Sequence, residues 1–187
     1  YLPHFISWVI MASIVGQILS PSNGIVNVLI KKLTGKTIFF LGDNKWFQPT
    51  LIITSIWKNF GYYMIILLAG LQGIPKYLYE SAEIDGATRW QRVLKIDLPS
   101  ILPTIMVMFI LNVGRLLSLG FEKVLLLQTE LNKATSDIIA VYVYEQGIIN
   151  AKYSYSTAVG LFNTVVNIIL LIIVNRIAKK AADVSFV

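Results

Sequence analysis

Four long apolar runs, separated by polar segments, dominate the pattern of this chain. They cover residues 5–19, 47–71, 98–119 and 153–175, and the only charged side chains inside them are Lys58 and Arg115. A helix needs about 20 mostly apolar residues to cross the hydrocarbon of a bilayer. The pattern therefore predicts an all-α integral membrane domain with four spans.

The segments between these runs are polar and are predicted to be aqueous loops. Residues 76–97 hold eight charged side chains, and an ionised group in hydrocarbon costs about 2.5–3.5 kcal/mol even on the most lenient scale. The loop over residues 121–152 contains a short apolar run, 138–144, that is too short to cross a membrane. We expect that run to form a short helix at the interface, capped by Ser136.

Composition strengthens the membrane interpretation and excludes several other classes. Of the 187 residues, 56% are hydrophobic and 14% charged, whereas soluble domains usually carry about 25% charged residues. The chain has no cysteine and one histidine, so neither a disulfide scaffold nor a metal site is predicted. The net charge of +6 comes from scattered basic residues, which fits membrane-surface lysines and no nucleic acid. Because the sequence opens at Tyr1 without methionine, we expect further sequence upstream.

The loop at residues 75–97 carries consistent local signals for two short helices joined by a glycine turn. Pro75 suits a helix start, Gly86 can end a helix in the left-handed conformation, and Thr88 with Gln91 has capping-box spacing. Pro99 is expected to prevent a smooth continuation into the third apolar run. Without further information, such a segment is most often a polar loop resting on lipid headgroups.

The first of these predicted helices has a face suited to protein contact. Tyr77, Ser81 and Ile84 fall near one stripe at helical spacing, and Glu80 and Glu83 lie beside it. A stripe of this kind could dock in a groove of another protein.

The same segment resembles the EAA loop of type I ABC importer permeases. That pattern is matched by Glu80-Ser81-Ala82, Asp85-Gly86-Ala87 and Ile96-Asp97-Leu98-Pro99. Ser81 replaces the usual alanine, and Val93 stands where an aromatic residue is common. Residues 1–8, 46–47 and 162–176 are further similar to permeases of the polysaccharide and oligosaccharide importer subfamily, so the resemblance covers nearly the whole chain.

The resemblance implies one transmembrane domain over residues 1–187, in which the four spans are the third to sixth of six. It also implies that loop 75–97 faces the cytoplasm of a bacterial cell, with the domain in the cytoplasmic (inner) membrane. The positive-inside rule cannot supply this orientation, because each side carries seven basic residues.

The resemblance further implies a coupling helix that docks on a cytoplasmic ABC ATPase dimer. The expected coupling residues are Glu80, Ser81, Ala82, Asp85, Gly86 and Ala87. Other expected partners are a second homologous permease, an extracytoplasmic solute-binding protein and an oligosaccharide. ATP and Mg would be bound by the ATPase, with no cofactor and no enzymatic activity in this chain. The phosphate-loop-like stretch 34–37 lacks the required first glycine, because that position is Ile30.

Polar side chains inside the spans are candidates for the translocation path. They are Asn59, Tyr62, Tyr63, Asn112, Arg115, Asn163 and Asn167. For each of them, the competing interpretation is an interhelical hydrogen bond or a core aromatic. If Arg115 lines the cavity rather than pairing with Glu122, the saccharide carries carboxylates.

Two other functions remain open. A gradient-driven secondary transporter often has acidic residues inside its spans, and this chain has none there. A membrane assembly subunit that transports nothing is the other alternative.

Overall fold

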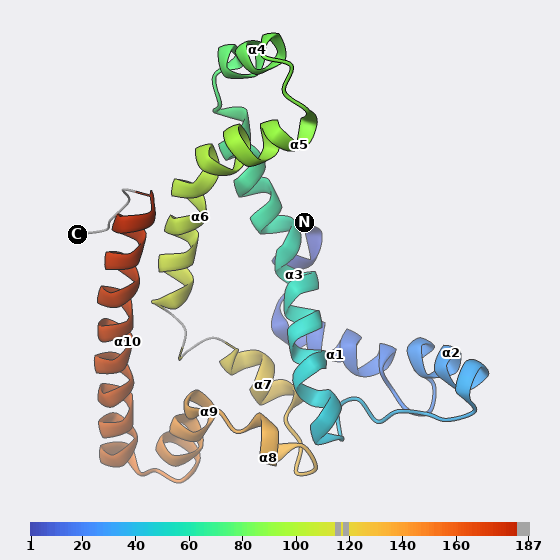
Figure 1. The fold of residues 1–187 in the computed structure, drawn as a ribbon. Coiled ribbons are helices and arrows are strands. Elements are labelled where there is room, and N and C mark those ends of the chain that lie inside the picture. The colour runs from blue at the N-terminus through green and yellow to red at the C-terminus, as the bar shows by residue number, and fades with distance from the viewer. Residues whose placement is uncertain (115–116, 118–119, 183–187) are drawn as a thin grey trace. The chain divides into compact units, whose positions relative to one another are not determined.

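The computed structural model describes residues 1–114, 117 and 120–182, and it describes side chains only as far as residue 180. Every regular element within these ranges is a helix (Figure 1), so the all-α prediction is confirmed. The chain forms two compact units. The first comprises residues 1–61 and 117–161, and the second comprises residues 62–116 and 162–187.

The first unit contains short helices and the N-terminal parts of two long helices. Its elements are η1 (Leu2–Phe5), α1 (Trp8–Ile18), α2 (Ile25–Thr34), the first part of α3 (Asn44–Gln72), α7 (Phe121–Leu127), α8 (Lys133–Ser136), α9 (Ile139–Tyr144), η4 (Glu145–Ile149) and the start of α10 (Tyr153–Ala182). Its core joins α1, α3 and α7 through Ala12, Phe47 and Leu127.

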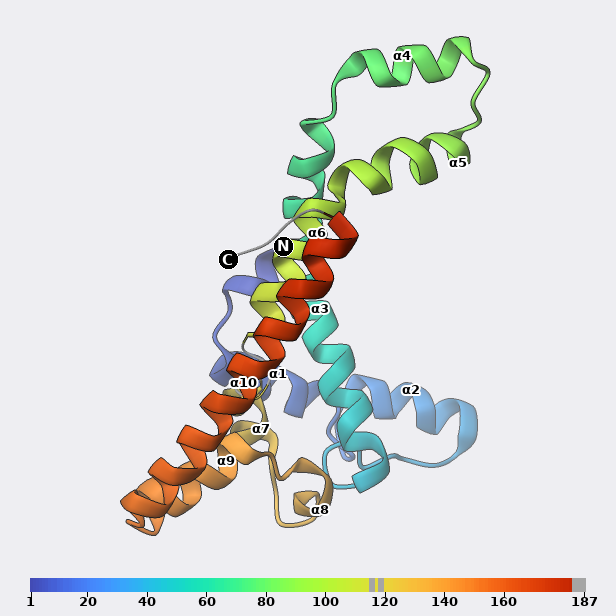
Figure 2. The same cartoon turned by 60° about the vertical axis from the view of Figure 1, so that its left-hand side comes forward.

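The second unit contains the remainder of α3 and α10 with the charged loop. Its further elements are α4 (Lys76–Ile84), α5 (Arg89–Arg92), η2 (Val93–Asp97) and α6 (Leu98–Val113). Ile110 of α6 packs against Val174 and Ala178 of α10, and both views show these two helices side by side (Figures 1 and 2).

Within the described ranges, three helices are long and apolar enough to cross a membrane. They are Asn44–Gln72, Arg89–Val113 and Tyr153–Lys180, and they coincide in position with three of the four predicted spans. In the first and third of these helices, 6% of the apolar 18-residue stretch is buried within this chain. The remaining apolar surface is suited to lipid or to other membrane helices.

The first apolar run, residues 5–19, does not form a long helix. The 3₁₀ turn η1 ends at Phe5, and Ser7 then caps a new helix whose backbone begins at Trp8. The resulting α1 has 11 residues, which gives a length of about 17 Å against a hydrocarbon core of about 30 Å. Apolar composition alone could not show this break, because an N-cap serine suits a helix start as well as a loop.

The third span also differs from expectation, because Pro99 does not interrupt it. Between α5 and α6 the backbone forms the π-helical turn η2, where the Leu98 N–H donates to the carbonyl of Val93. A wider π turn relieves the clash between a proline ring and the preceding turn of helix. One helix therefore runs from Arg89 to Val113.

Candidate functional site

The helix–glycine–helix segment of the second unit has the predicted local structure. Pro75 is the N-cap of α4, and Gly86 has a left-handed φ of 69°. The Ala87 N–H donates to the Ala82 carbonyl at 2.8 Å, which closes the end of the helix. Thr88 and Gln91 form the expected capping box, in which the Thr88 N–H donates to Gln91 Oε1 at 2.8 Å.

We call this segment, Lys76–Asp97, the elbow. Figures 1 and 2 show α4 beyond the ends of α3 and α6, with α5 leading back into α6. Tyr77 is 62% exposed and Ile84 is 87% exposed, and Ser81 between them is exposed as well. An apolar stripe left open beside carboxylates is typical of a protein-docking surface.

A hydrogen bond that the sequence did not predict closes the base of the elbow. The Tyr79 hydroxyl donates to Asp97 Oδ1 at 2.6 Å and so joins α4 to η2. This bond to a carboxylate raises the pKa of Tyr79 above its usual value, with a smaller contribution from burial. The two residues are 18 positions apart, and no local pattern links them.

The inner side of the elbow forms a cleft of about 320 Å³. Asp85, Gln91, Arg92 and Lys95 are among the residues that line it. The Nε of Arg92 is buried and has no hydrogen-bond partner among the described residues. The cleft therefore offers a charged donor to an acceptor from outside this chain.

Two of the predicted path residues are bonded to each other. The Tyr63 hydroxyl donates to Asn112 Oδ1 at 2.9 Å, and the Asn112 amide donates to the Met108 carbonyl at 2.7 Å. The ring of Tyr62 meets that of Tyr63 edge to face at 5.7 Å. This pair therefore forms an interhelical contact between α3 and α6, which is the competing interpretation given above.

Asn163 and Asn167 differ from that pair. Their Oδ1 atoms are buried and lack a hydrogen-bond partner among the described residues. Since the two residues are four apart on α10, they lie on the same helix face. Two carbonyl oxygens on one face are suited to receive hydroxyl donors.

The remaining two path residues are not grouped with these five. Asn59 belongs to the first unit, where its amide donates to the Ser55 carbonyl and its Oδ1 lies 3.2 Å from Nδ1 of His4. Arg115 lies outside the described residues. Its proposed cavity position, and its alternative pairing with Glu122, remain predictions.

Sequence reasoning missed the role of Lys58, which is 6% exposed. Its ammonium donates to the carbonyls of Pro3 (2.9 Å), His4 (2.8 Å) and Ile6, and it lies 5.3 Å from the centroid of the Trp8 ring. All three donors of the ammonium are therefore used. A lone lysine in an apolar run needs oxygen atoms as hydrogen-bond partners. The position of Lys58 in such a run was therefore the sequence signal for this role.

Lys123 of α7 approaches the same region. Its ammonium donates to the Ser55 hydroxyl and lies 5.8 Å from the Trp8 ring centroid. Burial lowers the pKa of Lys123, because a buried ammonium loses hydration. The start of the chain is thus attached to α3 by two lysines.

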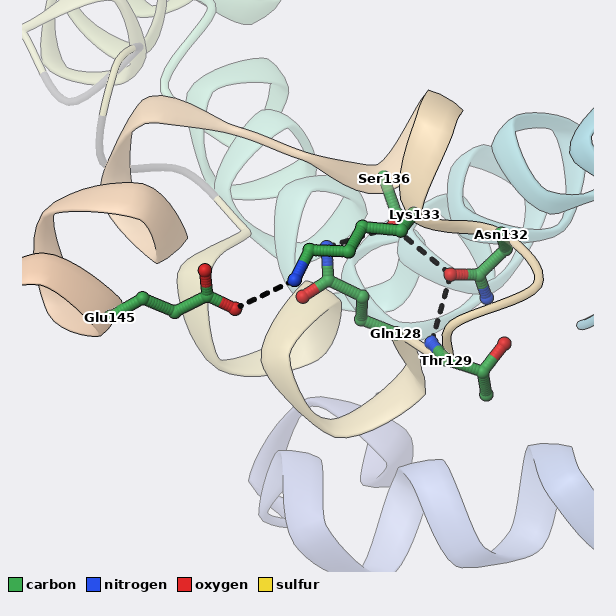
Figure 3. A network of polar contacts seen from close by, with 6 residues as sticks. All are labelled: Gln128, Thr129, Asn132, Lys133, Ser136 and Glu145. Carbon is green, nitrogen blue, oxygen red and sulfur yellow. Dashed lines mark hydrogen bonds and ion pairs between the residues drawn. The ribbon is translucent and has the colours of Figure 1, made fainter. Parts of the chain in front are cut away.

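Buried asparagines organise the loops of the first unit. Asn132 is 0% exposed and donates to the carbonyls of Leu41 and Leu127. Its Oδ1 accepts from the Thr129 N–H and the Ser136 hydroxyl (Figure 3). Ser136 therefore belongs to this network, and the N-cap of α9 is Ile138 without a side-chain bond, so the predicted Ser136 cap is wrong.

The phosphate-loop-like stretch forms the end of a helix. Gly35 is the left-handed C-cap of α2, and the Thr34 hydroxyl donates to the Ile30 carbonyl at 2.8 Å.

A family model described as "Binding-protein-dependent transport system inner membrane component" matches residues 1–183. Two similar proteins come from Bacillus subtilis (strain 168). Protein LplB is 48% identical over 180 residues, which cover 96% of this chain and 57% of LplB. The "polygalacturonan/rhamnogalacturonan transport system permease protein YteP" is 42% identical over 98% of this chain and 57% of that protein. The chain therefore spans little more than half the length of either relative.

Two solved structures are similar to this chain in fold as well as in sequence. A chain of a bacterial ABC transporter involved in the import of the acidic polysaccharide alginate is 41% identical, with a TM-score of 0.94 over 97% of this chain and 63% of that one. A second structure, of a bacterial alginate ABC transporter in complex with an alginate pentasaccharide-bound periplasmic protein, gives 40% identity and a TM-score of 0.95.

Proposed function

Because the chain belongs to the family of binding-protein-dependent transport system inner membrane components, we propose that it is the membrane-spanning permease of an ATP-driven oligosaccharide importer. It is a multi-pass protein of the inner membrane. The cargo is an oligosaccharide that carries carboxylates, delivered by a solute-binding protein. Hydrolysis of ATP with Mg takes place in a partner ATPase.

The elbow is the observation that carries this proposal. Its stripe of Tyr77, Ser81 and Ile84 is exposed. The Tyr79–Asp97 hydrogen bond joins α4 to η2, which leads directly into α6. A force applied to α4 is therefore passed to η2 and α6. ATP-driven closure of an ATPase dimer that grips α4 would tilt the spans and alternate access to the path.

The individual roles follow from charge and backbone geometry. Glu80, exposed beside the stripe, pairs with a basic side chain of the ATPase. Ala82 and Ala87 are half-buried and are joined by a backbone hydrogen bond. Between them lies Gly86, whose left-handed φ sets the angle between the two helices. Ser81 and Asp85 complete the contact surface, and Arg92 in the cleft meets an acceptor of the partner.

The elbow faces the cytoplasm, where ATP is available. The helix Arg89–Val113 crosses the membrane once, so residues 121–152 lie on the extracytoplasmic face. That face receives the solute-binding protein.

Two lines of support favour a saccharide cargo, and the first of them favours an acidic one. One is the likeness to a permease chain of a transporter that imports an acidic polysaccharide. The other is the pair of unpartnered oxygens of Asn163 and Asn167 inside a span, where hydroxyl donors of a sugar could bind. A second, homologous permease would complete the path.

The experiment is uptake by cells that express the full-length protein with its companion subunits. We expect radiolabelled oligosaccharide uptake to stop with vanadate and to persist with an ionophore, and the ATPase to co-purify. The opposite pattern would show a gradient-driven carrier, and no uptake with any saccharide would favour an assembly subunit.

The variant Glu80→Lys tests the elbow itself. Charge reversal at the contact should abolish uptake while the protein stays in the membrane. Glu130→Lys is the control, since Glu130 is also exposed but lies in the 121–152 loop. Wild-type uptake by Glu80→Lys would contradict the assignment.

A further inference from the structure

The turn between η4 and α10 in the first unit is held in an unusual conformation. Ala151 has a φ of 53° and is the only non-glycine residue with positive φ among the described residues. The Lys152 N–H donates to the Gln146 carbonyl at 2.8 Å, and the Asn150 N–H donates to the Glu145 carbonyl at 2.9 Å. The left-handed conformation is unfavourable for alanine, so the surrounding bonds must fix this turn.

The turn is also pressed closely against the start of α10. The Ser156 hydroxyl donates to the Val143 carbonyl at 2.7 Å. A Cβ on Gly147 would lie 2.5 Å from Ser156 Oγ, so only glycine fits there. This close packing makes the region behind the turn rigid.

Side chains from both segments line a cavity of about 480 Å³. They include Tyr142, Gln146, Lys152, Tyr153, Ser154 and Tyr155. The Tyr142 and Tyr155 rings meet edge to face at 6.3 Å, and their hydroxyls are 3.3 Å apart. The volume lies within the range of about 300–1,000 Å³ that is typical of small-molecule sites.

The groups at this cavity are available to a ligand. Tyr153 is 65% exposed and Tyr155 is 51% exposed. Lys152 is also exposed, and its ammonium forms no hydrogen bond or ion pair with the described residues. By contrast, the nearby Glu145 carboxylate is paired with Lys133 at 3.5 Å (Figure 3), which compensates its negative charge.

We propose that this cavity is an extracytoplasmic subsite for one uronic acid unit of the cargo, outside the membrane path. The tyrosine rings contact the apolar face of the sugar ring, the Gln146 amide and the Ser154 hydroxyl bind its hydroxyls, and the Lys152 ammonium binds its carboxylate. This inference rests on the proposed function, because it places cargo on the face that receives the solute-binding protein.

Tyrosines at the start of a span can instead serve as a membrane-interface belt. That role needs the aromatic rings but not a free ammonium. It also does not require a rigid cavity with amide and hydroxyl groups. The lysine therefore separates the two explanations.

The test measures uptake KM in cells that express the complete transporter. The two probes are radiolabelled trigalacturonate, which carries a carboxylate on each unit, and its methyl ester, which has none. We expect Lys152→Met to raise KM about tenfold for the acid and to leave KM for the ester unchanged. Lys152→Arg should keep the wild-type ratio, and Tyr155→Ala should raise KM for both probes.

Lys45→Met is the matched control, because Lys45 is an exposed lysine of the same unit outside the cavity. An unchanged acid-to-ester ratio in Lys152→Met would overturn the subsite, and so would tyrosine variants that lower only the amount of protein in the membrane. Wild-type uptake of the ester but not of the acid would overturn both the subsite and the acidic cargo of the proposed function. Failure of the wild type to take up either probe would also overturn the subsite, whereas the proposed function is overturned only when no saccharide is taken up.

Discussion

At the scale of single residues, asparagines do two different jobs in this protein. Some have every amide group bonded, as Asn132 does with four partners. Others keep an oxygen that has no partner among the described residues, as Asn163 and Asn167 do. A satisfied buried amide stabilises structure, whereas an unsatisfied one costs about 1–3 kcal/mol and is maintained where a ligand can use it.

Substitution of a fully hydrogen-bonded asparagine should lower the stability of the protein. Asn132→Ala removes four hydrogen bonds, three of them to backbone groups of Leu41, Leu127 and Thr129. We expect a loss of about 2–4 kcal/mol, visible as a lower midpoint of thermal unfolding in detergent. Asn150→Ala, at an exposed asparagine of the same unit, should leave the midpoint unchanged. Equal midpoints for both variants would contradict the role of Asn132.

Substitution of an asparagine whose oxygen has no partner should affect transport without lowering stability. Asn167→Leu removes a buried oxygen that has no bond, so we expect unchanged or higher thermal stability with uptake reduced several-fold. Asn112→Leu removes the partner of Tyr63 and should lower stability by about 1–2 kcal/mol. If Asn167→Leu transports like the wild type, Asn167 does not line the path.

At the scale of elements, the elbow depends on one backbone conformation. Gly86 and Gly35 both have left-handed φ values, of 69° and 72°, and a Cβ would meet nothing within 4 Å at either one. Any penalty for substitution is therefore a backbone effect. The two glycines differ only in their location, at the elbow and at the end of α2.

A comparison of proline substitutions at Gly86 and Gly35 separates an effect on coupling from an effect of backbone strain. Proline fixes φ near −65° and cannot adopt the conformation of either glycine. Gly86→Pro should uncouple ATP hydrolysis from uptake, whereas Gly35→Pro should show comparable local strain with coupling retained. The measurement is the ratio of saccharide imported to ATP hydrolysed in proteoliposomes. The same ratio in both variants would remove Gly86 from the coupling mechanism.

At the scale of the whole molecule, most apolar surface of the long helices is not covered by this chain. The chain also spans 57% of the length of each of the two relatives compared. Under the proposed function, the uncovered apolar surface meets lipid and a companion permease, and this chain contributes the elbow and part of the path.

Assembly should change protease access to the elbow. Lys76 and Arg89 are exposed at its two helices, and Lys31 and Lys32 are exposed on α2. We expect trypsin to cut at the elbow in the detergent-solubilised permease alone and to cut several-fold more slowly when the ATPase is bound. Cleavage at Lys31 and Lys32 should not change. An elbow cut equally fast in both preparations would show that the ATPase binds elsewhere.

Local chemistry determined much of this protein at the level of the sequence. Apolar runs located three long helices, and Pro75, Gly86, Thr88 and Gln91 determined the two short helices of the elbow. Each of these signals acts within about one helical turn, so neighbouring residues suffice to read it. The resemblance to importer permeases rested on the same segment together with residues 1–8, 46–47 and 162–176.

Only the tertiary structure decided which distant groups meet. It joined Tyr79 to Asp97 and Lys58 to the carbonyls of Pro3, His4 and Ile6, left the oxygens of Asn163 and Asn167 without a partner among the described residues, and brought Tyr142 against Tyr155 beside Lys152. It also divided the first apolar run at Ser7 and carried α6 past Pro99 through a π turn. The contacts between helices depend on packing between segments far apart in the chain. The break at Ser7 and the π turn are local backbone conformations, and neither kind of outcome is encoded by hydrophobic period and residue type alone.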